Sequence, residues 1–252
     1  MTGERDDQTT LTGEASGRAA KPPRPKIRRR PTEEKKAERA KPAGKPRDAD
    51  ATRAKVLQAA IVEFAEKGLT GARVDEIAAR AGFNKRMLYH YFGSKEELFQ
   101  AVLETVYTDV WEAEAALDLD DLSPDAALAG LVTFTWDYYL AHPEFMTLLS
   151  HENLLAARHF RQTETVGPKA RQSLDLVARI LDRGVAAGLF RPGIDPVQLN
   201  ITISAIGYYY LTNRYTASIV YERDMATAEA FAARLRFNIE TILAMVSAKA
   251  RI

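Results

Sequence analysis

Apolar residues between Ala51 and the C-terminus recur at three- and four-residue intervals, which is the spacing of one face of a helix. No stretch of comparable length alternates apolar and polar residues as a half-buried strand does. The chain is therefore predicted to be all-α. Start and stop signals divide it into predicted helices over residues 53–67, 74–81, 85–92, 94–116, 123–142, 167–188, 195–213 and 227–246.

The first 49 residues differ in composition from the rest. They contain one Leu, one Ile, no Val, no aromatic residue and six of the eleven prolines. Such a segment buries too little apolar surface to offset the entropy of ordering it, so residues 1–49 are predicted to be a disordered tail. Residues 21–47 carry twelve Lys or Arg and three Glu. The tail could therefore contact DNA phosphates, or it could be a solubilising leader, and the sequence leaves both open.

Charge is segregated along the chain although the net charge is only +1. Residues 1–50 carry a net +5, residues 51–100 a net +2 and residues 101–252 a net −6. A basic front half is expected when one end of a protein meets a polyanion, although an ordinary domain with a solvated basic tail fits equally well.

Several classes of protein are excluded by residues that the chain lacks. With no cysteine there is no disulfide framework, thiolate zinc site or cysteine nucleophile. No apolar stretch approaches the roughly 20 residues of a membrane span, and no apolar region follows the first basic residues as in a secretory signal. The four histidines lack metal-ligand spacing, and there is no GxGxxG or phosphate loop. We expect a soluble cytoplasmic protein that is not an enzyme and needs no membrane, metal or cofactor.

Residues 74–92 have the spacing of a helix-turn-helix. Ala78 is small enough for a second helix to approach, and Gly82, four residues later, tolerates the positive φ of the turn. A shared apolar face is formed by Ile77, Ala81, Leu88 and Phe92. The second helix then turns outward the residues that a major-groove helix needs, namely Lys85, Arg86, Tyr89 and His90. A helical hairpin presenting these side chains only to water is the alternative.

The segment GLTGARVDEIAARAGFNKRMLYHYFGSKEELF resembles the DNA-binding domain of TetR-type transcriptional regulators. The resemblance implies a three-helix DNA-binding domain over residues 50–98 and a helical ligand-binding and dimerisation domain over residues 99–252. It further implies a homodimeric repressor, paired through its last two helices, that a small-molecule effector releases from palindromic operator DNA. An architectural or constitutive DNA-binding protein is the alternative.

The same resemblance implies roles for individual DNA-binding residues. Tyr89 and Tyr91 would reach phosphates, His90 would lie against base edges, and Lys95 would pair with a phosphate. Tyr91 could instead be half-buried core. Lys85 and Arg86 are added because of their outward placement and charge, since Arg is the commonest reader of guanine.

Two positions depart from the family pattern. Arg73 stands where members usually have Thr or Ser, which would exchange a hydroxyl contact to phosphate for a cation. Arg86-Met87 replaces a small pair and enlarges the tip of the recognition helix.

Aromatic and polar residues in the second domain suggest a ligand pocket. The candidates are Trp136, Tyr138, Phe145, Glu152, Asn153 and Tyr209. Consecutive tyrosines at 208–210 point about 100° apart on a helix, so at least one must serve the core or a dimer interface. Glu152 could equally be an exposed or ion-paired charge. EFMTLLSHENLL and GIDPVQL also resemble pyrimidine-utilisation regulators of the family, although no ligand is inferred from that likeness.

Overall fold

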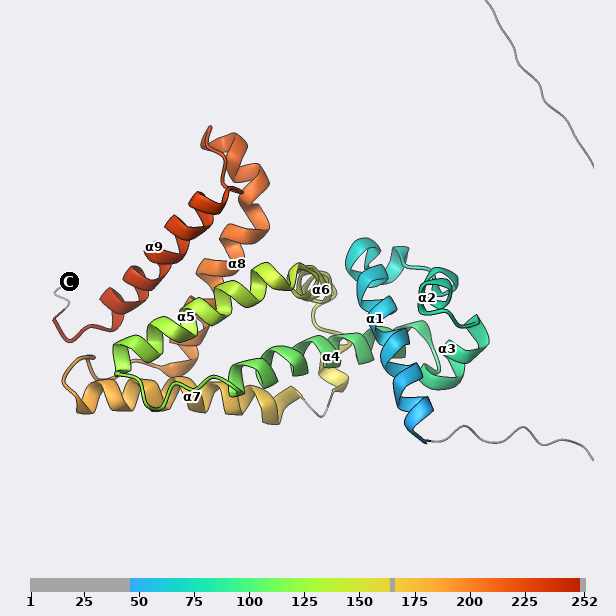
Figure 1. The fold of residues 1–252 in the computed structure, drawn as a ribbon, viewed down its shortest axis with the longest axis horizontal. Coiled ribbons are helices and arrows are strands. Elements are labelled where there is room, and N and C mark those ends of the chain that lie inside the picture. The colour runs from blue at the N-terminus through green and yellow to red at the C-terminus, as the bar shows by residue number, and fades with distance from the viewer. Residues whose placement is uncertain (1–45, 164–165, 250–252) are drawn as a thin grey trace, which may run out of the picture. The chain divides into compact units, whose positions relative to one another are not determined.

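The computed structural model describes residues 46–163 and 166–249, and α-helices dominate this part of the chain (Figure 1). Within it the all-α prediction is confirmed, since extended pairing there is limited to one isolated bridge between Phe190 and Ser247. The predicted tail falls almost wholly outside the described residues. The elements are α1 (Pro46–Gly71), α2 (Val74–Ala81), α3 (Lys85–Phe92), α4 (Lys95–Ala115), α5 (Pro124–Ala141), α6 (Pro143–Leu154), the 3-10 turn η1 (Phe160–Gln162), α7 (Val166–Ala186), α8 (Pro196–Val220) and α9 (Ala228–Val246).

Local signals account for the boundaries of the first four helices. Gly68 has φ 65°, so α1 is interrupted where a stop was predicted and resumes for only one turn. Gly82, at φ 75°, ends α2 in the left-handed conformation. The Asn84 side chain accepts the Met87 N–H at 3.0 Å to begin α3, and Ser94 Oγ accepts the Glu97 N–H at 3.1 Å to begin α4.

The second half contains helical structure that the sequence analysis does not predict. No helix is predicted over residues 143–154 or 160–162, yet α6 and η1 lie there, and Pro143 occupies the first turn of α6, where its missing N–H costs nothing. Helix α8 continues to Val220, seven residues beyond the predicted end at residue 213. Its last turns expose Ile219 and Val220 to solvent, so no buried apolar stripe marks them as helical in the sequence.

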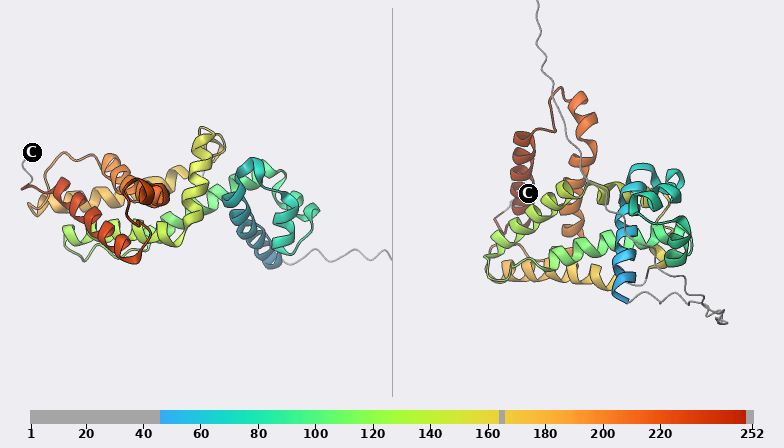
Figure 2. Two further views of the ribbon diagram at one scale, coloured as in Figure 1. Left: turned by 90° about the horizontal axis from the view of Figure 1, so that it is seen from above. Right: turned by 45° about the vertical axis from the view of Figure 1, so that its right-hand side comes forward.

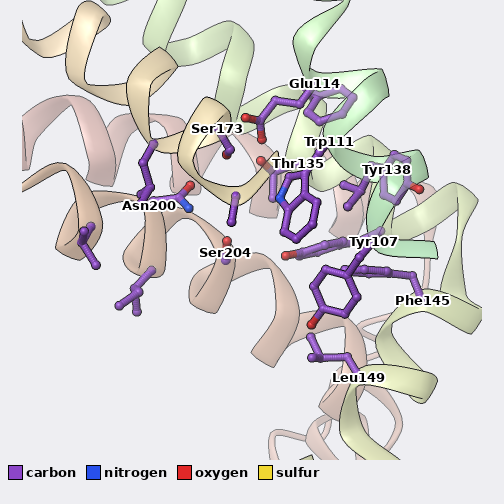
Figure 3. A pocket seen from close by; sticks show the side chains of 17 residues that line it. Tyr107, Trp111, Glu114, Thr135, Tyr138, Phe145, Leu149, Ser173, Asn200 and Ser204 are labelled. Atoms are coloured by element: carbon purple, nitrogen blue, oxygen red, sulfur yellow. The ribbon is translucent and has the colours of Figure 1, made fainter. Parts of the chain in front are cut away.

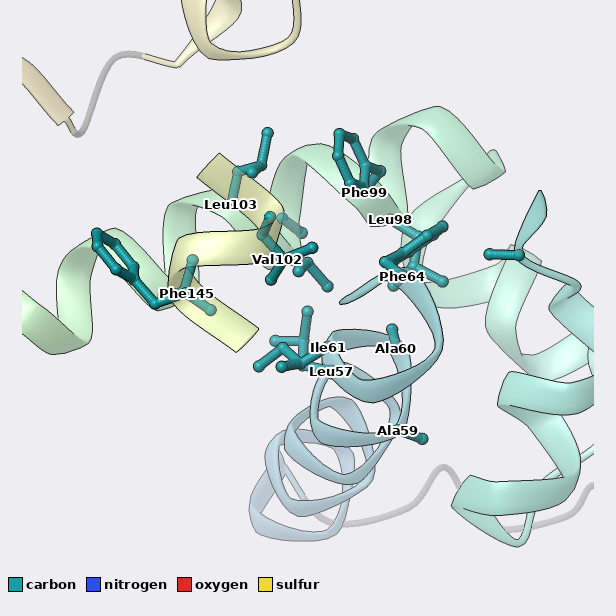
Figure 4. Close-up of a cluster of buried hydrophobic side chains, with 14 of the residues drawn as sticks. Leu57, Ala59, Ala60, Ile61, Phe64, Leu98, Phe99, Val102, Leu103 and Phe145 are labelled. Atoms are coloured by element: carbon teal, nitrogen blue, oxygen red, sulfur yellow. The ribbon is translucent and has the colours of Figure 1, made fainter. Parts of the chain in front are cut away.

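Two clusters of buried side chains stabilise the described chain. The first joins α1–α4 to α5 and α6, with Phe64 and Phe99 fully buried and their rings 5.0 Å apart (Figure 4). The second cluster lies where α5 packs against α7, α8 and α9 (Figures 1 and 2). Because α6 packs directly on α1, the two halves of the described chain share the first cluster.

Candidate functional sites

The turn between α2 and α3 holds the second helix at a defined angle to the first. The N–H of Gly82 donates to the Ala79 carbonyl at 3.2 Å, and the N–H of Phe83 donates to the Ala78 carbonyl at 2.9 Å. Ala78 is buried, as is Leu88 of α3. The close approach therefore depends on the small side chain at 78 and the left-handed glycine at 82.

Helix α3 keeps one face in the core and turns the other to solvent. Leu88 and Phe92 are buried, and the Arg53 guanidinium lies 5.1 Å from the centre of the Phe92 ring. The outward face consists of four exposed side chains, those of Lys85, Arg86, Tyr89 and His90. The predicted amphipathic division of this helix is thus present in the structure.

The three other predicted DNA-binding residues are partly buried or have contacts within the protein. Tyr91 is half-buried, and its ring lies 5.6 Å from that of His90. Arg73 is exposed just before α2, where its backbone N–H, but not its side chain, is held by Glu63 at 3.1 Å. Lys95 is half-buried at the start of α4, and its Nζ donates to the Thr70 carbonyl at 3.4 Å.

An ion pair restrains Lys85. Its Nζ lies 3.2 Å from Asp75 Oδ2, and both side chains are about half-exposed. An exposed pair of this kind contributes only about 0–1 kcal/mol, so the Lys85 ammonium can exchange Asp75 for another anion at little cost.

A cavity of about 370 Å³ lies among α4, α5, α6, α7 and α8 (Figure 3). Its aromatic wall consists of Tyr107, Trp111, Phe134, Tyr138, Tyr139 and Phe145. Its polar groups are those of Glu114, Thr135, Ser173, Asn200 and Ser204. An apolar enclosure with a few polar groups is the usual form of a small-molecule site.

Burial shifts the pKa values of groups around the cavity. It raises the pKa of Tyr107 well above its ordinary value, with Tyr139, Tyr208 and Glu152 adding to the shift. It also raises the pKa of Tyr138 to about 12, with Asp109 and Glu144 adding to the shift. Both phenols therefore stay protonated at neutral pH and can donate hydrogen bonds. Burial also raises the pKa of the Glu114 carboxyl, which a hydrogen bond from Ser173 partly offsets.

Of the six ligand residues predicted from sequence, Tyr138 and Phe145 line this cavity. Trp136 points elsewhere and packs its ring against those of Tyr210 and Phe231, at 5.7 and 6.2 Å. Tyr209 is 65% exposed on α8 and does not line the cavity. Asn153 lies beside a neighbouring hollow that shares Asn200 and Ser204 with the cavity.

Glu152 is also absent from the cavity wall, because it anchors the chain after α6. It is 3% exposed, and its Oε1 accepts the backbone N–H groups of His159 at 2.7 Å and Phe160 at 2.9 Å. Its Oε2 lies 2.9 Å from Nδ1 of His159. Of the two alternatives to a ligand contact, the structure fits a partnered charge and not an exposed one, because Glu152 is buried beside His159.

Sequence reasoning missed the contribution of α4 to the cavity. Tyr107, Trp111 and Glu114 stand at positions i, i+4 and i+7, which places them on one face of the helix. A signal is thus present in the sequence, although the apolar spacing of residues 94–116 predicts only a long helix there and no pocket residue. Asn200 and Ser204, an i, i+4 pair on α8, were missed in the same way.

The described residues contain neither a membrane-spanning helix nor a cluster of metal ligands. Within 46–163 and 166–249 no helix is both long and apolar enough to cross a membrane. The same residues hold no group of three or more His, Cys, Asp or Glu side chains that could bind a metal ion.

Two family descriptions match the chain. Residues 56–102 match "Bacterial regulatory proteins, tetR family", and residues 124–242 match "Tetracyclin repressor-like, C-terminal domain". The first range contains the helix-turn-helix, and the second contains most of the helices around the cavity.

Individual proteins agree with these matches. The HTH-type transcriptional repressor NicS of Pseudomonas putida is 41% identical over 189 residues, which are 75% of this chain and 89% of that protein. The HTH-type transcriptional regulator RutR of Escherichia coli K12 is 31% identical over 155 residues, or 62% of this chain and 71% of that protein. The crystal structure of SCO4942 from Streptomyces coelicolor has a TM-score of 0.59 at 28% identity, covering 77% of this chain and 98% of that one.

Proposed function

The chain belongs to the TetR family of bacterial transcriptional regulators, and on this premise we propose a homodimeric repressor that an effector releases from a palindromic operator. The observation that carries the proposal is the outward face of α3. Its cations and hydrogen-bonding aromatics are exposed while Leu88 and Phe92 fix the helix to the core. A helix supported in this way can enter the major groove. Such a regulator works in the cytoplasm, where the operator is.

The seven predicted DNA-binding residues take two kinds of role in this proposal. Arg86 and His90 read base edges from the exposed face of α3. The others contact phosphates and position the helix, without reading sequence themselves, and these are Arg73, Lys85, Tyr89, Tyr91 and Lys95. The weak Lys85–Asp75 pair suits this role, because a phosphate can replace the carboxylate.

Dimerisation is supported by apolar side chains left exposed on the last two helices. Tyr215 and Ile219 of α8 are 65% and 80% exposed, and Phe237 of α9 is 57% exposed. Exposed apolar residues gathered on one part of a molecule mark interaction sites. A second copy of the chain would cover them, and a two-fold dimer would present two α3 helices to the two halves of a palindrome.

Effector release requires contact between the cavity and the DNA-binding helices, and aromatic rings supply it. Tyr107 lines the cavity, and its ring lies 4.5 Å from that of Phe160. His159 is the residue before Phe160, and the centre of its ring lies 5.2 Å from that of Phe99. The Phe99 ring centre in turn lies 5.0 Å from that of Phe64 in α1. A ligand that displaces Tyr107 would therefore disturb the packing under α1.

Fluorescence anisotropy with duplexes from the DNA beside the gene tests operator binding. We expect one palindromic duplex to bind far more tightly than its scrambled version, and light scattering to give the mass of a dimer. Arg86→Ala should reduce the preference, whereas Arg171→Ala, which removes an exposed cation from α7, should not. Equal affinity for all duplexes would contradict the proposal, and operator binding that no small molecule reverses would favour the constitutive alternative.

A further inference from the structure

Glu114 is the one charged side chain in the wall of the cavity, as far as the described residues go. It is 8% exposed, and Figure 3 shows its carboxylate beside Ser173 among the lining side chains. The remaining polar members of the wall are neutral hydroxyl and amide groups. A buried carboxylate is costly unless a cation or several hydrogen-bond donors face it.

No cation lines the cavity beside Glu114 in the described helices around it. Lys, Arg and His are missing from the cavity wall formed by α4–α8 in the described chain. Arg179 lines a smaller neighbouring hollow together with Glu114 and Asp120, and it is not part of the wall of the larger cavity. Among described groups, burial and the Ser173 hydroxyl are the influences on the pKa of Glu114, with no contribution from a cation. The carboxylate is left with one hydroxyl donor.

The rest of the wall offers neutral hydroxyl and amide groups and aromatic rings. The Thr135 hydroxyl donates to the Leu131 carbonyl at 2.9 Å, so it presents only lone pairs to the cavity. Trp111 and Tyr107 lie on the same face of α4 as Glu114, and their rings are 5.3 Å apart. Aromatic faces attract cations, and the attraction strengthens where water is excluded.

We propose that the effector is a small organic cation, a protonated amine on a flat or aromatic framework, whose ammonium group pairs with Glu114. The inference rests on the proposed function, since it names the chemical class of the effector. The amine donates to the Glu114 carboxylate in a charge-assisted hydrogen bond, and its framework stacks against Trp111 and Tyr107. A carboxylate-bearing ligand is disfavoured, because it would place a second negative charge beside Glu114 with no cation to compensate.

Calorimetry and thermal-shift measurements on the full chain without DNA test the proposal. The probes are phenyl, naphthyl, indolyl and pyridyl frameworks, each carried as an ethylamine, an ethyl alcohol and a propanoate. We expect an amine to bind at least about tenfold more tightly than the alcohol and the propanoate of its own framework, which corresponds to about 1.4 kcal/mol. Glu114→Gln should abolish that preference, whereas Asp175→Asn, which removes an exposed carboxylate from α7, should leave it intact.

Three outcomes would overturn the proposal: tighter binding of a propanoate or alcohol, an unchanged amine preference in Glu114→Gln, or no binding by any amine. The wild-type ranking decides the matter even if Glu114→Gln fails to fold. Because DNA is absent, the result is separate from the proposed function. Amine binding without release from the operator would count against the repressor mechanism alone, and release by a carboxylate would count against the cationic effector alone.

Discussion

Replacing Glu152 with Leu should destabilise the protein through the loss of one anchor. The carboxylate now accepts two backbone N–H groups and faces the His159 ring, and leucine can accept none of these bonds. Leaving a buried donor without a partner costs about 1–3 kcal/mol, so two such donors imply a loss of about 2–6 kcal/mol. The turn before them adds to the loss, because Ala156 and Ala157 both have φ 55° and need external support.

Glu152→Gln is the matched control. The glutamine oxygen can keep both backbone hydrogen bonds, and the other His159 tautomer can accept from the new amide through Nδ1. We therefore expect this variant to lose less than about 1 kcal/mol and to keep its response to effector. Urea unfolding at one protein concentration measures both changes, and a loss of about 3 kcal/mol should lower the midpoint by about 1 M or more.

Two results would refute this account of Glu152. An unchanged midpoint in Glu152→Leu would mean that the anchor contributes little. A Glu152→Gln protein with normal stability but no effector response would mean that Glu152 contacts the ligand, as the sequence suggested, and not only the backbone.

Three further expectations concern DNA. Lys95→Ala should weaken binding to all duplexes alike and reduce the slope of log K against log salt by about 0.9, as measured by titration at several salt concentrations. Arg86→Ala should lose about 1–3 kcal/mol of discrimination at one base pair in a competition assay, and equal loss at every position would contradict base reading. Deleting residues 1–47 should leave the circular dichroism of the helical part unchanged and, if the tail contacts phosphates, lower affinity for operator and scrambled DNA by a similar factor at low salt. Unchanged affinity for both duplexes would instead favour the solubilising leader.

The family and the helix-turn-helix could be predicted because both depend on local sequence. The Ala78 to Gly82 spacing, the Asn84 and Ser94 caps and the apolar faces act within a few residues of each other. The resemblance to TetR-type regulators, including the pyrimidine-utilisation regulator RutR, is confirmed by the comparisons. The roles of individual DNA-binding residues remain predictions, since α3 is described here without DNA.

The cavity could not be predicted in the same way, because side chains from five helices, between Tyr107 and Ser204, build it. Trp136 and Tyr138 illustrate the difficulty: two residues apart on α5, they point about 200° apart, so only one can face the cavity. The sequence marks both as aromatic candidates for a ligand pocket without saying which neighbour each side chain meets.

The sequence by itself determined most of the local features of this protein, namely the helices of the DNA-binding domain, the caps of α3 and α4 and the outward face of α3. Only the tertiary structure decided that Tyr138 faces the cavity while Trp136 meets α8 and α9, that Glu152 anchors a turn, and that Glu114 is buried without a cation. The physical reason is the distance along the chain over which each effect acts. Propensity and capping act over one or two turns of helix, whereas the surroundings of a buried side chain depend on which helix faces meet, and that depends on packing of the whole core.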